Sequence, residues 1–290
     1  MYFATAGIEI SPFTPVLAAF FISLVCSMGG VSGAFLLLPF QISVLGYTSP
    51  GVSATNHIFN VVACPAGVWR YAREGRLLLP LALCVIAGTL PGVFLGALVR
   101  VTWLAELQKF MIFVALVLLY IGGRMCLQMV KSKGTVPRHN KCEILSATLG
   151  GFSFRFDDEV YQVQNMSLLA LSFAVGLIGG VYGIGGGAIM SPFLTALFKL
   201  PVYAIAGATL LATFMTSLAG VVFFSIFSLL GHAESSPDWG LGLLFGIGGI
   251  FGMYCGATLQ KRIPPGVLRM ALLAIIMLMG LNYLFKGLGL

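Results

Sequence analysis

The segment GGVYGIGGGAIMSPF, residues 179–193, decides the architecture of this chain. It holds six glycines in its first nine residues, lies between apolar runs and ends just after a proline. Glycine adopts backbone conformations that other residues avoid, and proline cannot continue a helix interior. Such a run could cradle a phosphate, break a membrane helix, or allow two helices to pack closely. The rest of the sequence has to decide among these readings.

The composition of the chain is that of a protein embedded in a lipid bilayer. Of its 290 residues, 59% are hydrophobic and 9% are charged, whereas soluble domains carry about 25% charged residues. The apolar sequence forms segments of about 16 to 25 residues, the length at which a helix crosses ~30 Å of hydrocarbon. Alternating strands of about 10 residues, which an outer-membrane barrel requires, are absent from these segments. The sequence therefore predicts an all-α polytopic membrane protein.

The apolar segments form two groups of five. The first run has no Lys or Arg ahead of it, unlike a cleaved signal peptide, so we expect it to remain in the mature fold. The six cysteines lack C-x-x-C spacing, and we interpret them as small core residues. The predicted segments cover residues 13–29, 31–46, 51–69, 77–99 and 107–130, and then 167–182, 186–198, 203–230, 240–260 and 266–286.

Positive charge gathers in connections that we predict to be cytoplasmic, following the positive-inside rule. Thirteen of the sixteen Lys and Arg residues lie in such connections, around positions 70–76, 124–155, 199 and 261–269. We predict that the other connections, including 100–109 and the acidic 231–239, face outward together with both termini. Because basic residues first report orientation in a membrane protein, the pI of 9.2 gives no reason to expect a nucleic-acid partner.

The two groups of segments are repeats of each other. With a constant offset of 153, SLVCSMGGVSGAFLLLPF aligns with GLIGGVYGIGGGAIMSPF, and at offset 160 the glycine row 88–96 aligns with the row 248–256. We predict an N-terminal membrane repeat over residues 1–130, a cytoplasmic loop over 131–166 and a C-terminal membrane repeat over 167–290. Within the loop, FSFRFDDEVYQV alternates around an Asp-Asp-Glu turn and predicts a small hairpin.

The repeats are predicted to be inverted in the membrane. Each contains an odd number of segments, and the basic connection 70–76 corresponds to the acidic connection 231–239. Inverted repeats are typical of secondary transporters, whose substrate site lies near the bilayer midplane between the repeats. The hypothesis is a transporter of a small anion. The alternatives are a transporter of another small anion or carboxylate, a membrane-embedded enzyme, and a non-transporting accessory or sensor subunit.

The two glycine clusters are the first candidate substrate site. Unwound backbone is tolerated at membrane depth only inside protein or along a cavity, and the N-terminus of the next half-helix attracts anions. A P-loop is excluded because no Lys-Ser/Thr follows. Close helix packing is the alternative here, and it is our expectation for the rows 88–96 and 248–256. The candidate residues are Gly30, Ser32 and Gly33 in the first cluster and Gly183, Gly185 and Gly186 in the second.

A polar stripe on the third segment of each half is the second candidate. Asn56, Asn60 and Cys64 share one helical face, and their equivalents at offset 153 are Thr209, Thr213 and Ser217. We predict that Asn56, Asn60, Thr209 and Thr213 donate to the substrate, and interhelical hydrogen bonding is the alternative. His57 lies one position away from the stripe, where it could relay protons or simply pack within the bundle.

Carboxylate side chains are missing from the interior of the apolar segments. All nine acidic residues lie in loops or at segment ends, and no His, Asp, Glu and Cys constellation converges on the spans. We therefore expect no catalytic residues, no metal and no cofactor. The coupling ion stays open on the same grounds.

Together, these motifs identify a resemblance. The block GLIGGVYGIGGGAIMSPFL, its weaker copy SLVCSMGGVSGAFLLLPFQ, the polar helix that follows and FSFRFDDEVYQV resemble the TauE/SafE family of sulfite exporters and related organosulfur anion permeases. The resemblance covers nearly the whole chain. It implies a multi-pass permease of the cell inner membrane that moves sulfite, a sulfonate or a similar small anion, in import or export and in an oligomeric state left open.

Overall fold

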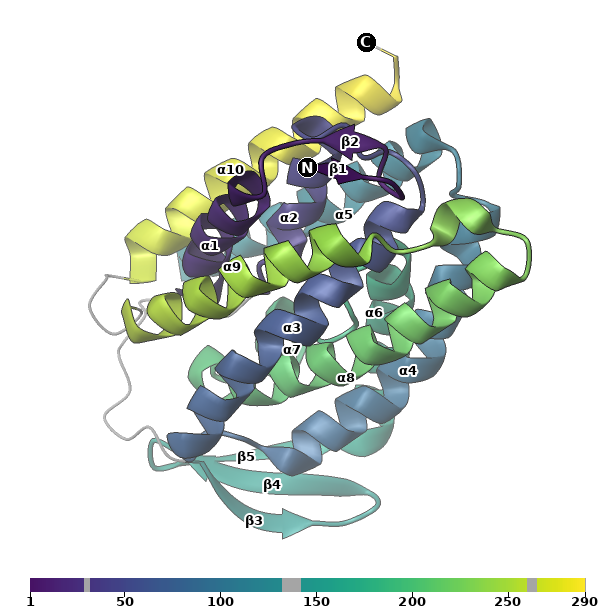
Figure 1. The fold of residues 1–290 in the computed structure, drawn as a ribbon. Coiled ribbons are helices and arrows are strands. Elements are labelled where there is room, and N and C mark those ends of the chain that lie inside the picture. The colour runs from purple at the N-terminus through teal and green to yellow at the C-terminus, as the bar shows by residue number, and fades with distance from the viewer. Residues whose placement is uncertain (29–31, 132–141, 260–264, 290) are drawn as a thin grey trace.

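Helices make up most of the computed structural model, which describes residues 1–28, 32–131, 142–259 and 265–289 (Figure 1). The first half contains α1 (Phe13–Met28), α2 (Ala34–Ser43), α3 (Gly51–Arg73), α4 (Leu79–Thr102) and α5 (Leu107–Lys131). The second half contains α6 (Asn165–Tyr182), α7 (Met190–Leu197), α8 (Val202–Leu229), the 3-10 helix η1 (Ala233–Ser235), α9 (Trp239–Leu259) and α10 (Pro265–Gly287). Pro50 and Pro201 directly precede α3 and α8, positions at which the missing N–H costs no helix bond.

The helices confirm the predicted class of all-α, multi-pass membrane protein. Five described stretches are long and apolar enough to cross a membrane, and they involve α4, α5, α6, α8 and α9. The second segment of each half is shorter than the sequence predicts, because α2 has ten residues and α7 has eight. At 1.5 Å per residue these helices reach about 15 and 12 Å, so neither crosses ~30 Å of hydrocarbon alone.

The two halves of the chain pack against each other throughout the bundle. Helix α1 packs on α9 as α4 packs on α6, and α3 packs on α9 as α8 packs on α4. The remaining major contacts join α3 to α8 and α5 to α10. The counterparts are the helices in the same position of each half, so that α1 corresponds to α6 and α4 corresponds to α9. If every helix is replaced by its counterpart, the same set of helix pairs results. The inverted orientation of the halves in a membrane stays a prediction.

The glycine rows bring these helices together, as expected from the sequence. A Cβ atom on Gly92 of α4 would meet the backbone of α6, 2.7 Å from the nitrogen of Leu177. One on Gly252 of α9 would meet α1, 2.9 Å from the Cβ of Ser23. Only glycine permits such close backbone approach, so these rows are packing surfaces rather than candidate sites.

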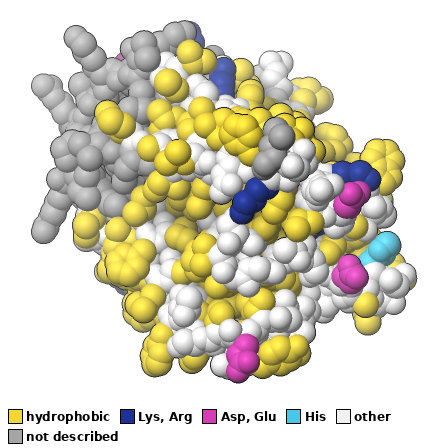
Figure 2. Space-filling model, turned by 90° about the horizontal axis from the view of Figure 1, so that it is seen from above, with side chains coloured by type: hydrophobic (Ala, Val, Ile, Leu, Met, Phe, Trp, Pro, Cys, Tyr) yellow, Lys and Arg dark blue, Asp and Glu magenta, His cyan; other side chains and the backbone are white. Residues whose placement is uncertain are grey.

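The two ends of the bundle carry different small sheets. Both termini and the β1 (Tyr2–Phe3) and β2 (Ile8–Glu9) pair lie at one end, where Asp238 accepts a hydrogen bond from the Ala6 nitrogen at 3.2 Å (Figure 1). Seen from that end, hydrophobic side chains cover much of the surface and charged ones are few (Figure 2). The opposite end holds β3 (Glu143–Ala147), β4 (Gly151–Phe156) and β5 (Glu159–Gln164), an antiparallel sheet in the order β3-β4-β5.

The sheet contains the hairpin that the sequence predicts. Strands β4 and β5 pair around a turn at Asp157 and Asp158, both with positive φ, while β3 is an addition that the pattern did not reveal. The Cys142 nitrogen donates to the Gly75 carbonyl at 3.0 Å, which fastens the sheet to the connection after α3. The basic connection 70–76 and the sheet, which the charge distribution assigns to the same side of the membrane, therefore lie together at one end of the molecule.

Candidate functional site

The glycine segment breaks the helix in the second half. Helix α6 ends at Tyr182 because Gly183 takes the left-handed conformation with φ of 80°, and Gly185 follows with φ of 73°. Helix α7 begins only at Met190. In the first half α1 ends at Met28 and α2 begins at Ala34, directly after Gly33, whereas Gly30 lies outside the described residues.

The break is enclosed by three long helices. A Cβ atom on Gly183 would lie 2.7 Å from the Cβ of Ser53 on α3, and one on Gly186 would lie 2.5 Å from the Cβ of Thr89 on α4. On the side of α8, the Gly186 nitrogen donates to the Thr216 hydroxyl at 3.2 Å. The sequence did not single out Ser53, Thr89 or Thr216, because only tertiary packing brings these hydroxyl residues to the glycines.

Asn60 is the centre of the polar contacts around the break. Its amide nitrogen donates to the Ile184 carbonyl at 2.9 Å and to the Ser217 hydroxyl at 3.1 Å. Its amide oxygen accepts from the Ser32 hydroxyl at 2.6 Å and from the Cys64 thiol at 3.7 Å. Asn60 therefore links both polar stripes to both glycine clusters, and its two amide hydrogens already have protein acceptors in this structure.

The other members of the stripes are buried and satisfied within the protein. Asn56 donates to the Ala34 carbonyl at 3.0 Å and accepts from Gln41 at 3.4 Å. The hydroxyl groups of Thr209 and Thr213 donate hydrogen bonds to carbonyls of their own helix. Both stripes face the bundle interior as predicted, and in this conformation they make hydrogen bonds between helices and within α8.

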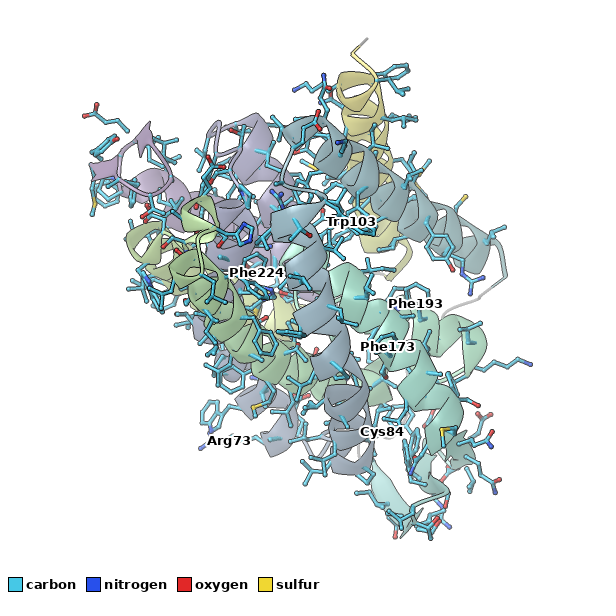
Figure 3. The ribbon with its side chains drawn as sticks, turned by 90° about the vertical axis from the view of Figure 1, so that its right-hand side faces the viewer. Arg73, Cys84, Trp103, Phe173, Phe193 and Phe224 are labelled. Carbon is cyan, nitrogen blue, oxygen red and sulfur yellow. The ribbon has the colours of Figure 1, made fainter. Side chains whose placement is uncertain are left out.

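His57 is fully buried between α3 and α8. Neither ring nitrogen has a hydrogen-bond partner among the described residues. The ring lies over Gly220, where an added Cβ would come within 2.6 Å of Nε2, and 5.9 Å from the ring of Phe224, which Figure 3 labels. A buried imidazole normally has a partner for its N–H, so this residue is an exception within the bundle.

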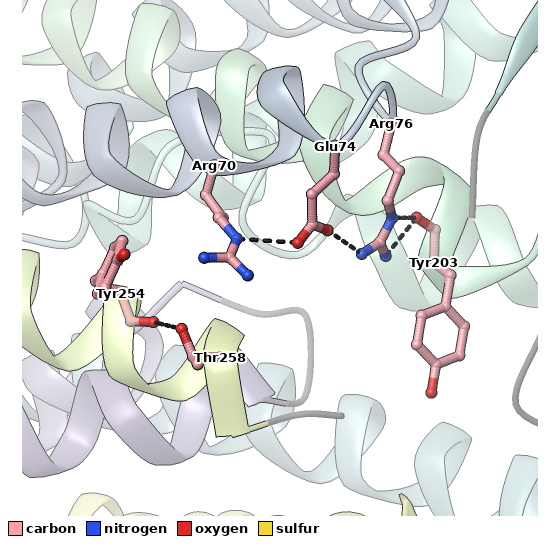
Figure 4. Close-up of polar contacts among 6 residues, drawn as sticks. All are labelled: Arg70, Glu74, Arg76, Tyr203, Tyr254 and Thr258. Carbon is pink, nitrogen blue, oxygen red and sulfur yellow. Dashed lines mark hydrogen bonds and ion pairs between the residues drawn. The ribbon is translucent and has the colours of Figure 1, made fainter. Parts of the chain in front are cut away.

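A charged cluster joins the halves at the end of α3 near the three-stranded sheet (Figure 4). Glu74 accepts from Arg70 at 2.9 Å and from Arg76 at 3.0 Å. The Arg76 guanidinium also donates to the backbone carbonyl of Tyr203, near the start of α8, at 2.7 and 3.0 Å. This end of the bundle is therefore held by charge-assisted bonds between the two halves.

In this helical bundle the two halves enclose a non-helical backbone segment that contains no charged residues. That is the architecture of a membrane transporter. The chain belongs to the sulfite exporter TauE/SafE family, whose profile matches residues 16–283. This match agrees with the resemblance seen in the glycine motifs.

Curated relatives carry transporter names. The chain is 27% identical over 127 residues to the probable membrane transporter protein YunE of Bacillus subtilis, an alignment that spans 44% of either chain. It is 24% identical over 239 residues to a probable membrane transporter protein of Xylella fastidiosa strain Temecula1, covering 81% of this chain and 79% of the relative. The chain thus spans less than half of the Bacillus relative in this match. No solved structure matches it significantly.

Proposed function

We propose that the protein is a secondary transporter that moves sulfite, a sulfonate or a related small sulfur anion across the inner membrane. Its two halves act as inverted repeats, with both termini outside and the 131–166 loop inside. The observation that carries the proposal is the glycine break between α6 and α7, enclosed by hydroxyl and amide side chains of α3, α4 and α8.

The break offers backbone donors to an anion. Within the described residues, no protein acceptor takes the backbone N–H groups of Gly185, Gly187 or Ile189, which lie just before α7. Oriented N–H groups at the start of a helix attract negative charge.

In this proposal, side chains of the polar stripes position the backbone of the break. Asn60 holds the Ile184 carbonyl, and Thr216 holds the Gly186 nitrogen. We infer that Asn56, Asn60, Thr209 and Thr213 exchange these protein bonds for bonds to the anion during the cycle. His57 is the candidate proton relay between α3 and α8.

The proposal is tested with purified protein in liposomes. Radiolabelled sulfite is placed outside, and its accumulation is measured against empty liposomes and against competition by sulfate, thiosulfate, sulfoacetate, taurine and a small carboxylate such as acetate. A transporter moves one of these anions with nothing else added. Chemical conversion of sulfite would indicate an enzyme, and the absence of both flux and conversion would indicate an accessory protein.

A further inference from the structure

Arg100 is the largest fully buried side chain among the described residues. The sequence places it in an outward connection, but the structure includes it in α4, two residues before the helix ends at Thr102. Trp103, which Figure 3 labels, marks this end of α4, whereas Cys84 lies toward the opposite end. The guanidinium is thus taken into the bundle instead of projecting into water.

The contacts of Arg100 leave part of the guanidinium unused. Its Nε donates to the Ser53 hydroxyl at 3.3 Å, and its Nη1 donates to the Leu104 carbonyl. The guanidinium carbon Cζ lies 3.8 Å from the ring centroid of Phe110. Among the described residues, its Nη2 has no hydrogen-bond partner. In the described part of the chain no ion pair joins Arg100 to a carboxylate.

Ser53 connects this guanidinium to the glycine break. The Ser53 hydroxyl accepts from Arg100 and donates to the Val181 carbonyl at 3.2 Å, in the last turn of α6. Gly183 packs directly on Ser53, 2.5 Å from its Cα if a Cβ is added. Arg100 is therefore one side chain away from the unwound segment.

A purely structural role explains only part of this arrangement. A cation near a helix C-terminus and over an aromatic face is favourable, which accounts for the contacts to Leu104 and Phe110. However, a buried charge without a counter-ion is unfavourable, and proteins normally pair it. An ionisable side chain at this depth with an unused donor is the expected mark of a binding site for an anion.

We propose that Arg100 binds the transported anion at the end of the glycine break that lies beside α4. The Nη2 group supplies the donor for one oxyanion group, since a guanidinium matches the geometry of sulfonate, sulfite and carboxylate oxygens. This inference rests on the proposed function and adds a charged residue to its site. At offset 160 the corresponding residue is Gln260, so the fixed charge belongs to only one half.

The test measures anion binding and stability on the same purified variants. The affinity for sulfite, sulfate, thiosulfate and sulfoacetate is determined by titration calorimetry for the wild type, R100Q, R100K and the control R155Q. Arg155 is exposed and forms an ion pair with Glu143 on the sheet, and it is not one of the residues that enclose the break. We expect R100Q to weaken anion binding at least tenfold, R100K to weaken it less, and R155Q to leave it unchanged.

Melting temperatures separate binding from packing. If Arg100 holds the anion, the anion-free R100Q protein melts at or above the wild-type temperature, because an unpaired buried charge has been removed. A lower melting temperature together with wild-type affinity overturns the inference, and so does wild-type affinity in R100K if R100Q does not fold. A wild-type protein that binds none of the four anions overturns both this inference and the proposed function. Wild-type binding with an unaffected R100Q overturns this inference alone.

Discussion

The side chain of Asn60 donates a hydrogen bond to the backbone carbonyl of Ile184 at 2.9 Å, across the boundary between the two halves of the chain. The amide belongs to the long helix α3, and the carbonyl belongs to the unwound segment between α6 and α7. A helix break leaves backbone groups without their regular partners, and here a buried side chain replaces one of them. A side chain of the opposite half therefore helps to set the shape of the glycine segment.

Replacing Asn60 should cost much more stability than replacing Thr213. Asn60→Leu removes the side-chain donor to the Ile184 carbonyl and to the Ser217 hydroxyl, and it removes the acceptor of the Ser32 hydroxyl. This should lower the free energy of unfolding by about 1–3 kcal/mol. Thr213→Val removes a bond only to its own helix and should change stability little. Thermal unfolding of both proteins measures the difference. Equal melting temperatures would show that Asn60 does not hold the break.

The same pair of variants tests the binding role of the stripe. If the stripe donates to the anion, Thr213→Val weakens sulfite binding by about ten- to a hundredfold, because a hydrogen bond to a charged group is worth roughly 1.5–3 kcal/mol. We expect this loss at nearly unchanged melting temperature. Wild-type affinity in Thr213→Val would remove the threonines from the site and leave the backbone donors of the break.

A side chain at Gly186 should stop transport. An added Cβ would lie 2.5 Å from both Cβ and Cγ2 of Thr89, so the break and α4 must separate to accept it. Gly186→Leu is expected to abolish sulfite flux while the protein still inserts into the membrane. Gly123→Leu on α5 is the matched control, since nothing lies within 4 Å of an added Cβ there. Flux at the wild-type rate in well-expressed Gly186→Leu would place the substrate path elsewhere.

The sequence predicted the class of fold and the position of the break, because both depend on composition and local backbone preference. Long apolar runs require helices in a bilayer, and six glycines in nine residues cannot continue one. Residues that the repeat offset aligns make equivalent contacts in the structure. His57 lies over Gly220, and its counterpart Leu210 lies over Gly67, 2.9 Å from an added Cβ.

The contacts that hold the site were beyond the sequence pattern. The stripe correctly identified Asn60 as buried, but only packing shows that its amide is bonded to Ile184 and Ser217. Arg100 was assigned to an outward connection because charged residues usually end a membrane segment. Its burial depends on Ser53 and Phe110, which come from other helices.

Cysteine labelling should determine the sidedness of the molecule. Leu149 is fully exposed in the turn between β3 and β4, and Glu234 is exposed within η1 at the other end. On a cysteine-free background, Leu149→Cys should react only with reagents that enter the cytoplasm, and Glu234→Cys should react with impermeant maleimide in intact cells. The reverse pattern would contradict the orientation derived from the basic connections.

The native Cys142 should react slowly with thiol reagents in a protein that keeps it as the single cysteine. Burial raises the pKa of its thiol to about 11, so almost none of it is thiolate at neutral pH. Its rate of alkylation by iodoacetamide should keep rising between about pH 9 and 11, whereas the rate for Leu149→Cys should level off near the ordinary thiol pKa of about 8.5. Identical pH profiles would show that Cys142 is open to water.

The role of His57 can be tested by replacing it with leucine, the residue type at its counterpart position 210 in the second half. Since Leu210 fills the equivalent place over Gly67, His57→Leu should pack over Gly220 without strain, and it removes two ring nitrogens that have no partner among the described residues. We expect the melting temperature to stay equal or rise. If His57 relays protons, the stimulation of sulfite flux by an imposed pH gradient in liposomes should disappear, while exchange of sulfite at equal pH continues. Retained stimulation in a stable His57→Leu protein would show that the histidine only packs between α3 and α8.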